Sequence, residues 1–404
     1  MSPKDEWPFS QLDVTTAGIS GFRPRAFREF VLKVHQRCNL ACDYCYVYTM
    51  GDETWHAKPV TMTRDIWKAA AGRIAEHALT HDLTEVRIVL HGGEPLLAGI
   101  DRLLTMVEDV QRALPAGCRL RTSLQTNGVL LNEPTLQVLL TSSVEVGVSL
   151  DGTPEDNDRH RRWANGRGSH DTVAGALRLL SLTRYRPAFA GLLCTVDVDA
   201  DPVECYEALL RHSPPTIDFL LPHGNWSRPP PRPAGRSPTP YGDWLVAVFD
   251  RWFGAPQQET RIRLLEELIN LTLGGASRSE HLGLSPVAVA VIESDGSIEQ
   301  VDSLKSAYPG ASATGLHLFT NSFDEALTHP GIMARQLGRA ALCETCLACP
   351  VHQICGAGHY AHRYKVGSGF LNPSVYCADL TRLITHVQRR LATEIRARVT
   401  GKQR

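Results

Sequence analysis

The sequence predicts an α/β protein in which six strand–helix units form an open, partial barrel, followed by a smaller C-terminal domain. Six short apolar runs alternate with amphipathic stretches in the first half of the chain. The 404 residues, 43% of them hydrophobic, suffice for one large core and a smaller one. Cysteines then gather near the C-terminus, in a stretch punctuated by glycine and proline.

Each of the six apolar runs has the length and the polar boundaries of a buried strand. Residues 64–79 follow the first run and place apolar side chains three and four positions apart, as in a helix that packs on a sheet. Right-handed crossovers would curl six such units into a barrel, but six are too few to close an eight-stranded one. The carboxyl ends of the strands should then meet at one rim. The runs are 30–34, 85–91, 119–126, 144–150, 188–196 and 216–222.

A proline-rich stretch separates the predicted barrel from the rest of the chain. Residues 226–240 contain too many prolines for a helix or a sheet interior, so we expect an exposed connection. Helical patterns follow at 241–253 and 261–273, residues 287–304 alternate around an Asp-Gly pair as in a hairpin, and a terminal helix is expected over 379–398. The predicted parts are an N-terminal extension (1–29), the barrel (30–225), the connection with linking helices (226–285), the C-terminal domain (286–383) and a helix with its tail (384–404).

The charge and hydropathy of the chain exclude two classes of partner. The formal net charge is −1 and the sequence pI is about 7.0, so no global field attracts nucleic acid or an anionic membrane. No apolar stretch reaches the length of a membrane span, and the first ten residues lack a secretion signal. We therefore expect a cytoplasmic protein with neither nucleic acid nor a membrane as partner.

The distribution of the 11 cysteines points to metal chemistry. Disulfides are rare in a reducing compartment, so grouped cysteines there are more often metal or redox ligands. Three lie between residues 38 and 45 and five between residues 343 and 377. The other three, Cys118, Cys194 and Cys205, are expected to be small buried hydrophobic residues.

The first group, Cys38, Cys42 and Cys45, follows the first predicted strand in the segment CNLACDYC. Structural zinc requires four ligands, and here only His35 could be the fourth, although it belongs to the predicted strand. A [4Fe–4S] cluster is normally held by four thiolates. Three thiolates leave one iron open, and an open iron at the mouth of a barrel can bind and activate a small ligand.

CNLACDYC resembles the CxxxCxxC motif of radical S-adenosylmethionine (SAM) enzymes, whose fold is a partial (β/α)6 barrel. The resemblance implies that the open iron chelates SAM and that an electron from the cluster cleaves SAM to a 5′-deoxyadenosyl radical, which abstracts a hydrogen atom from substrate. It also implies an external electron donor of the flavodoxin or ferredoxin type. Tyr44 is implied to pack near the adenine, and Tyr46 to contact it through its backbone.

Three further motifs resemble the SAM-binding elements of this family. HGGEP (91–95) looks like the GGE motif, in which glycines let the backbone approach the ligand and Glu94 accepts a hydrogen bond from the SAM ammonium. QTNG (125–128) and SLDG (149–152) end later strands and would line the ribose and carboxylate side of SAM. The residues implied to bind SAM are Tyr44, Tyr46, Gly92, Gly93, Glu94, Gln125, Asn127, Ser149, Asp151 and Arg161.

The arginine of that set comes from NDRHRR (157–162), which resembles a D-x-x-R element whose arginine holds the SAM carboxylate. The spacing maps the element onto Asp158 and Arg161. Arg159 and Arg162 are neighbours that could be mistaken for the binding residue.

The second cysteine group begins at Cys343 and, taken alone, suits structural zinc and an iron–sulfur cluster equally. The region resembles a SPASM domain, the C-terminal extension of peptide-modifying radical SAM enzymes, which usually holds two auxiliary [4Fe–4S] clusters. The residues that match the ligands of the second auxiliary cluster are Cys346, Cys349, Cys355 and Cys377. Cysteines for the first are missing, since Val301 and His359 stand where two are expected. The resemblance therefore implies one auxiliary [4Fe–4S] cluster, in which Cys343 could replace one ligand, and which serves structure or electron transfer.

Asp302 directly follows Val301, where some relatives carry an aspartate that removes a proton from substrate. We therefore take Asp302 as the candidate catalytic base, with a solvated hairpin aspartate as the alternative. The polar side chains of GHYAHRY (358–364) either face substrate or satisfy carbonyl groups of their loop.

Nearly the whole chain resembles, more narrowly, the FxsB-like radical SAM/SPASM peptide maturases. Their substrates are ribosomally made precursor peptides, and characterised members join an aromatic ring carbon to the β-carbon of a residue two places on, which gives a three-residue cyclophane. The 29 residues before Phe30 are too few for a winged-helix leader-binding domain, so a leader would pair with an exposed strand edge or come through a separate protein.

Two alternatives remain open from the sequence. One is another radical SAM peptide modification, namely thioether formation, epimerisation or formylglycine formation, each with a different mass change. The other is a non-catalytic metal-binding scaffold, which would not produce 5′-deoxyadenosine.

Overall fold

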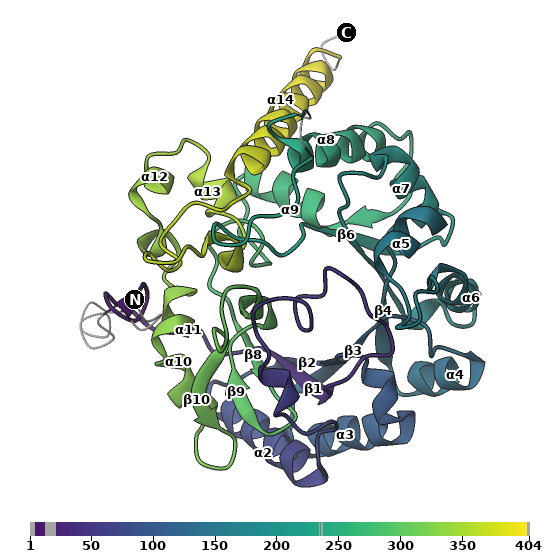
Figure 1. The fold of residues 1–404 in the computed structure, drawn as a ribbon, viewed down its shortest axis with the longest axis vertical. Helices are drawn as coiled ribbons and strands as arrows, with labels where there is room; N and C mark the ends of the chain where they lie inside the picture. Colours follow the sequence, from purple (N-terminus) through teal and green to yellow (C-terminus); the bar gives the residue numbers. More distant parts are fainter. Residues whose placement is uncertain (1–4, 13–21, 234, 236, 402–404) are drawn as a thin grey trace.

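The computed structural model describes residues 5–12, 22–233, 235 and 237–401 (Figure 1). One ten-stranded sheet curls into an incomplete barrel, in the strand order β10-β9-β8-β1-β2-β3-β4-β5-β6-β7. Most of the longer helices lie on the outside of this ring (Figure 1). The expected N-terminal extension and C-terminal tail lie partly outside the described residues, at 1–4, 13–21 and 402–404.

The six predicted strands all form and pair in parallel, which confirms the predicted class of fold. Alternating apolar side chains set the register, so that Phe30 pairs with Ile88 and Leu32 with Leu90. All four of these side chains are fully buried. The strands are β1 (Glu29–His35), β2 (Glu85–Gly92), β3 (Arg119–Thr126), β4 (Val144–Ser149), β5 (Phe189–Thr195) and β6 (Thr216–Leu220).

The helices between the strands begin at side-chain caps that the sequence provides. The Asn132 side chain accepts a hydrogen bond from the backbone N–H of Thr135 at 3.0 Å, and Asp201 caps α7 (Pro202–Leu210) in the same way. The helices of the barrel and its connection are α2 (Arg64–Thr80), α3 (Ile100–Ala113), α4 (Glu133–Thr141), α5 (Pro154–His160), α6 (His170–Leu180), α7 (Pro202–Leu210), α8 (Pro240–Phe253) and α9 (Arg263–Thr272). Short 3-10 turns are η2 (Thr54–His56), η3 (Pro95–Ala98) and η4 (Arg186–Ala188).

The C-terminal domain continues the sheet of the barrel. The predicted hairpin forms as β8 (Val289–Ile292) and β9 (Ser297–Glu299), and β8 pairs in parallel with the free side of β1. Two strands that the sequence did not suggest, β7 (Arg261–Ile262) and β10 (Ala313–His317), extend the two ends of the sheet. The hairpin therefore joins the two domains through backbone hydrogen bonds.

The rest of the C-terminal domain consists of short helices and turns around a second, smaller core. Trp7 from the N-terminal segment belongs to this core together with Leu304, Tyr360 and Phe370, and the Phe370 N–H donates to the Trp7 carbonyl at 3.4 Å. The N-terminal segment thus packs on the C-terminal domain. The short elements are η5 (Asp302–Ser306), α10 (Phe323–Leu327), α11 (Pro330–Ala334), η6 (Gly338–Ala341), α12 (Glu344–Leu347), α13 (His352–Cys355) and η7 (Tyr360–Arg363).

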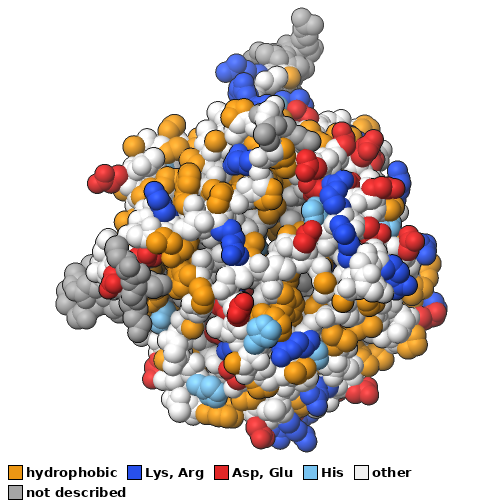
Figure 2. Space-filling model, in the orientation of Figure 1, with side chains coloured by type: hydrophobic (Ala, Val, Ile, Leu, Met, Phe, Trp, Pro, Cys, Tyr) orange, Lys and Arg blue, Asp and Glu red, His pale blue; other side chains and the backbone are white. Residues whose placement is uncertain are grey.

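The terminal helix α14 (Cys377–Gly401) starts two residues before its predicted beginning and crosses the expected boundary at residue 384. Buried Asp379, in its first turn, accepts hydrogen bonds at 3.0 Å from the N–H groups of Tyr241 and Gly242, which docks α14 on α8. Basic side chains gather on the projecting part of α14 (Figure 2). No described helix is both long and apolar enough to cross a membrane.

Candidate active site

The three cysteines of the first group lie in the loop that follows β1, and this loop runs across the inside of the barrel ring (Figure 1). It encloses a cavity of about 370 Å³, which we call the SAM cavity because most of the residues expected to bind SAM line it. The loop residues that line it include Cys38, Cys42 and Cys45. The residues that line it from later strand ends are His91, Gly92, Gly93, Gln125, Thr126, Asn127, Ser149, Leu193, Thr195 and Leu220. The expectation that these motifs meet at one rim is therefore confirmed by the lining.

The three thiols suit a multi-iron group better than a single zinc ion. Four thiolates at 2.3 Å around one zinc ion would have their sulfur atoms roughly 3.8 Å apart. In the described part of the chain, no set of three potential ligands that includes one of these cysteines has its atoms all within 4.8 Å. His35 turns its Nδ1 to the backbone of Arg37, at 3.1 and 3.2 Å, and does not line the cavity. The zinc site with His35 is therefore not formed.

The surroundings of the three thiols disfavour the thiolate form that a metal group requires, so the charge of that group would have to stabilise it. Burial raises the pKa of Cys38 and Cys45, and it raises the pKa of Cys42 to about 12 even though Arg161 lowers it. Thiols with raised pKa values stay protonated at neutral pH unless a positive charge lies beside them, and bound metal ions would provide that charge. Asn127 Nδ2 also lies 3.6 Å from Cys38 Sγ, in position to donate to a thiolate.

The two glycines of HGGEP are required by packing against the cysteine loop. A Cβ atom on Gly93 would lie 1.9 Å from the Tyr48 hydroxyl and 2.4 Å from the Arg37 carbonyl, and one on Gly92 would lie 2.1 Å from the His35 carbonyl. The Gly93 N–H donates to that His35 carbonyl at 2.8 Å. The glycines therefore allow the end of β2 to hold the start of the cysteine loop, in addition to lining the cavity.

Glu94 and Asp151 do not line the SAM cavity but lie directly behind its wall. Glu94 is fully buried and accepts hydrogen bonds from the Leu96 N–H, the Thr126 hydroxyl and the Asn127 N–H at 3.0, 2.8 and 2.8 Å. The bonds from Thr126 and Asn127 fix the end of β3 against the end of β2. The predicted contact of Glu94 with the SAM ammonium stays a prediction, and the structure assigns Glu94 a clear role in positioning Asn127.

Arg161 is the arginine of NDRHRR that lines the cavity. It is buried and donates to the Tyr44 hydroxyl at 2.8 Å, and Tyr44 in turn donates to Asp151. Arg159 pairs with Asp156 and Asp197, whereas the exposed Arg162, which follows α5, donates to backbone carbonyls of that helix. The structure thus distinguishes Arg161 from its two neighbours. The buried Nε of Arg161 has no partner among the described residues.

The second group of five cysteines surrounds the short helices α12 and α13 and the first residue of α14. Burial raises the pKa of Cys346 to about 12 and that of Cys355 to about 11. The next largest cause is a neighbouring cysteine, which is Cys343 for Cys346 and Cys377 for Cys355, and it also raises the pKa. Cys349 and Cys343 likewise act on the pKa of Cys377 after burial. All five sulfurs therefore lie near one another, and Cys343 belongs to the group. Here too the described residues contain no three thiols within 4.8 Å, so a single zinc ion does not fit.

The place expected for a first auxiliary cluster contains an ion-pair network. His359 Nε2 lies 2.7 Å from Glu280, and the same carboxylate pairs with Arg335. Burial would raise the pKa of Glu280, but Arg335 and His359 hold it well below its usual value. Val301, the other expected cysteine position, is buried in the smaller core. The residues present therefore fit one auxiliary cluster, not two.

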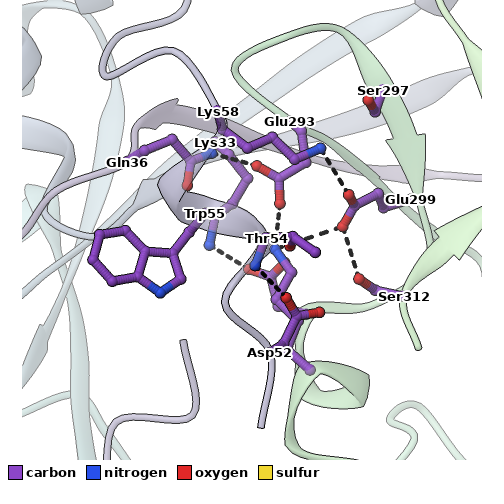
Figure 3. A network of polar contacts seen from close by, with 12 residues as sticks. Lys33, Gln36, Asp52, Thr54, Trp55, Lys58, Glu293, Ser297, Glu299 and Ser312 are labelled. Carbon is purple, nitrogen blue, oxygen red and sulfur yellow. Dashed lines mark hydrogen bonds and ion pairs between the residues drawn. The ribbon is translucent and has the colours of Figure 1, made fainter. Parts of the chain in front are cut away.

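Asp302 is buried in an ion-pair network and is not the solvated hairpin aspartate of the alternative interpretation. Its carboxylate accepts from Lys33, whose ammonium is fully buried, and lies 3.3 Å from Lys305. Burial alone would raise the pKa of Asp302. The positive charges of Lys305 and Lys33 outweigh burial, so the pKa of Asp302 is lowered overall. Glu293, which accepts from Gln36 and Lys305, continues the network (Figure 3). A base so held by two ammonium groups is a weak proton acceptor.

A second cavity of about 650 Å³ adjoins the SAM cavity. The residues that line both are Tyr46, His91, Arg263, His281 and Ser303, so the two spaces lie on either side of these shared side chains. Asp302 faces only the second cavity. Together the two spaces can hold a segment of peptide beside the three cysteines.

Sequence reasoning missed two of the histidines of this wall. His223 and His281 line the SAM cavity together with His359 and His362. The segment GHYAHRY pointed to the last two, whereas His223 follows β6 and His281 precedes β8 with no motif around either. Only the end of a predicted strand, which should reach the same rim, could have suggested His223.

Comparison with known proteins agrees with this geometry. Residues 32–193 match the Radical SAM superfamily. The cysteine-type anaerobic sulfatase-maturating enzyme of Clostridium novyi is 27% identical over 271 residues, which cover 66% of this chain and 70% of that protein. The serine-type anaerobic sulfatase-maturating enzyme of Klebsiella aerogenes is 27% identical over 363 residues, which cover 87% of this chain and 84% of that protein.

Two solved structures share the fold. Native anSMEcpe with bound AdoMet superposes with a TM-score of 0.77 at 21% identity, over 90% of this chain and 98% of that one. Streptococcus suis SuiB bound to the precursor peptide SuiA gives a TM-score of 0.60 at 14% identity, over 90% and 78%. The architecture is thus a partial radical SAM barrel with a SPASM-like C-terminal domain. Residues 32–193 therefore correspond to a radical SAM domain, and this protein is an enzyme whose cofactors are SAM and [4Fe–4S] clusters.

Proposed function

We propose that this enzyme modifies a ribosomally synthesised precursor peptide by joining an aromatic ring carbon to the side-chain β-carbon of a residue two positions away. The observation that carries the proposal is the pairing of one three-cysteine site with one complete auxiliary thiol set, beside adjacent cavities of about 370 and 650 Å³. The relatives support peptide substrates. One similar structure contains a precursor peptide, and two relatives in sequence are sulfatase-maturating enzymes.

The residues around the SAM cavity have distinct tasks in this reaction. Cys38, Cys42 and Cys45 would hold a cluster with one open iron, and, when bound, cluster and SAM supply a radical that abstracts hydrogen from an unactivated carbon. Arg161 presents a buried guanidinium to the SAM carboxylate, and its bond to Tyr44 fixes its direction. An external donor of the flavodoxin or ferredoxin type would supply the electron.

The peptide reaches the site through the second cavity. This cavity is lined by charged side chains of β7 and α9, including Arg261, Arg263 and Glu267, and by the β1–β8 side of the sheet. Its lining joins β7, one end of the sheet, to residues of β1 and β8. A peptide entering there passes Tyr46 and His281 before it reaches the SAM cavity.

The crosslink requires an electron acceptor and a proton acceptor. An aromatic ring that has gained a carbon substituent regains aromaticity when it loses one electron and one proton. The electron acceptor would be the auxiliary cluster held by cysteines of the second group. For the proton we favour His281, which lines both cavities and whose pKa burial lowers, so that its imidazole is neutral and can accept. Asp302 is less suited because two lysines hold its carboxylate.

A second candidate function is formylglycine formation at a serine or cysteine of a protein substrate. The match to anaerobic sulfatase-maturating enzymes over as much as 87% of the chain favours it. The two reactions differ in the residue that loses its β-hydrogen, which is serine or cysteine for formylglycine and another residue type for most crosslinks.

Deuterium transfer separates the two candidates. The reconstituted enzyme is incubated with SAM, a reductant and a precursor peptide encoded beside its gene, with β-deuterium placed in one residue type at a time. Deuterium in 5′-deoxyadenosine from a residue other than serine or cysteine, together with a peptide two hydrogens lighter, supports the crosslink. Transfer only from serine or cysteine, with a product that still fragments at every peptide bond around that residue, would show formylglycine chemistry instead.

A further inference from the structure

Three imidazole rings meet in the wall of the SAM cavity, at a place to which no role is yet assigned. His223 follows β6, whereas His359 and His362 lie at η7 in the C-terminal domain. The ring centroids are 5.6 Å apart for His223 and His359, 5.7 Å for His223 and His362, and 5.0 Å for His359 and His362. One ring nitrogen of each lies within 4.8 Å of the other two. The three rings thus form a nearly equilateral triangle.

This spacing is close to that of a three-histidine metal site. Imidazoles that bind a tetrahedral ion at about 2.0–2.1 Å have their ring centres roughly 5 Å apart. The observed separations of 5.0–5.7 Å require only a small inward movement of the rings. Imidazoles that only hydrogen-bond or stack would contact one another two at a time. Their ring nitrogens would not surround a single point.

Two of the three rings have a buried nitrogen that lacks any described partner. These atoms are His223 Nδ1 and His362 Nε2. His362 is 3% exposed, so solvent does not replace the missing partner. Buried polar atoms are nearly always satisfied, and an orphaned pair in one cluster calls for a ligand.

The third ring is held as metal-binding histidines usually are. His359 Nε2 lies 2.7 Å from Glu280, and Arg335 fixes that carboxylate from its other side. A histidine ligand commonly donates one ring N–H to a carboxylate, which orients the other nitrogen toward the metal. That other nitrogen, Nδ1, receives only a long bond of 3.3 Å from the Ala361 N–H. An ion would replace this weak contact.

We propose that His223, His359 and His362 bind one divalent transition-metal ion, for which zinc is the probe, with an open coordination position that faces the SAM cavity. Imidazole ligands suit zinc and related borderline ions, and three protein ligands with one open position are typical of sites that act on a substrate. The open position would take an oxygen or nitrogen atom of the substrate. Metal binding itself does not depend on the proposed function, whereas a peptide as the ligand of the open position does.

A second histidine cluster in the chain provides the control. His77, His81 and Asp324 also lie within 4.8 Å of one another. There, however, His77 Nε2 accepts the Phe27 N–H at 3.0 Å, so its Nδ1–H donates to Asp324 at 2.8 Å, and no nitrogen of His77 is left for a metal. This cluster on α2 is explained by its hydrogen bonds.

The test is made on the holoenzyme with its iron–sulfur clusters reconstituted, so that the cysteines are already occupied. The protein is dialysed against zinc, bound zinc and iron are counted by mass spectrometry, and X-ray absorption at the zinc edge identifies the neighbours of the ion. We expect one zinc ion per chain, surrounded by nitrogen and oxygen at about 2.0–2.1 Å. Sulfur neighbours at about 2.3 Å would overturn the proposal, because they would show zinc bound by cysteines.

Variants locate the ion. His362→Ala and His223→Ala should each weaken zinc binding at least about tenfold, while His81→Ala should leave the zinc content unchanged. His223 is only partly buried, so its variant tests the site even where His362→Ala does not fold. Unchanged zinc in His223→Ala with a normal iron content would contradict the proposal, as would loss of zinc in His81→Ala. None of these readouts uses a peptide, so their failure is distinct from failure of the proposed function.

Discussion

The ammonium group of Lys33, on the first strand of the barrel, pairs with the carboxylate of Asp302, 269 residues later in the C-terminal domain. Lys33 also donates to the Gly92 carbonyl at 3.3 Å, at the end of the neighbouring strand. Both side chains are buried. One ion pair therefore fixes the C-terminal domain to the strand that carries the cysteine loop.

Loss of Asp302 should first affect stability. Asp302→Asn leaves the ammonium groups of Lys33 and Lys305 buried without their shared carboxylate, and breaking a buried pair in this way typically costs about 3–5 kcal/mol of unfolding free energy. Urea denaturation of the purified proteins measures the change. Asp295→Asn removes a half-exposed partner of Lys58 and should cost no more than about 1 kcal/mol. A variant of Asp302 with wild-type stability that cleaves SAM but fails to crosslink would instead support a catalytic base.

Arg161 should govern SAM affinity. Arg161→Ala removes the buried guanidinium that faces the cavity, and the loss of charge-assisted hydrogen bonds predicts a Kd for SAM about 10–100-fold higher. Isothermal titration of SAM into the cluster-loaded protein measures this. The neighbouring Arg162→Ala is the matched control, because its guanidinium contacts only backbone carbonyls, and its Kd should stay within about twofold. Equal effects of the two substitutions would contradict the assignment.

The glycine at 93 should be intolerant of any side chain. In Gly93→Ala the new Cβ would overlap the Tyr48 hydroxyl and the Arg37 carbonyl, so the cysteine loop must move and SAM cleavage should fall at least about a hundredfold. Gly72→Ala on α2 has open space around the new methyl group and should instead stabilise the helix by about 1 kcal/mol. The yield of 5′-deoxyadenosine with dithionite compares the two, and normal turnover of Gly93→Ala would refute the packing argument.

His160 should make the stability of the enzyme depend on pH. Its ring lies 2.9 Å from Asp43 in the cysteine loop and 3.2 Å from Asp197 after β5, and the bond to Asp197 is the largest cause that raises its pKa to about 9. Because the pKa is raised on folding, this contribution is complete below about pH 6.5 and is lost as the pH rises toward 9. The unfolding free energy should therefore fall over this range in the wild type and fall less in His160→Gln. Identical pH profiles would show that the two ion pairs do not matter.

The two cysteine groups should separate the steps of the reaction. Alanine at Cys38, Cys42 or Cys45 should abolish 5′-deoxyadenosine formation, because each removes a ligand of the cluster that has the open iron. Alanine at Cys346, Cys349, Cys355 or Cys377 should leave SAM cleavage at least partly active and stop formation of the modified peptide. Chromatography of 5′-deoxyadenosine and peptide from the same reaction tests both. Full SAM cleavage by Cys42→Ala would contradict the site.

Local patterns in the sequence were sufficient for the barrel and for much of the site. All six predicted strands form, because each is a short apolar run whose alternation matches a buried sheet face, and the spacing of Cys38, Cys42 and Cys45 identified the loop after β1. β7 has only two residues, and β10 alternates too weakly to be recognised. Both depend on pairing with strands that are already in place.

The remaining differences concern long-range contacts. Glu94 and Asp151 belong to recognisable motifs, yet whether they face the cavity or support its wall depends on partners such as Thr126 and Tyr44. No spacing rule could bring His223 to His362, since the fold alone brings the end of β6 against η7. Asp302 could not be recognised as a buried residue because its partner Lys33 lies on a different domain.

The most direct test of the central claim is the mass of a precursor peptide co-expressed with this enzyme, followed by tandem mass spectrometry of the product. We predict a loss of two hydrogens per modification, with no fragmentation between an aromatic residue and the residue two positions on, and with no serine or cysteine altered. An unchanged mass, or a change confined to one serine or cysteine, would contradict the crosslink.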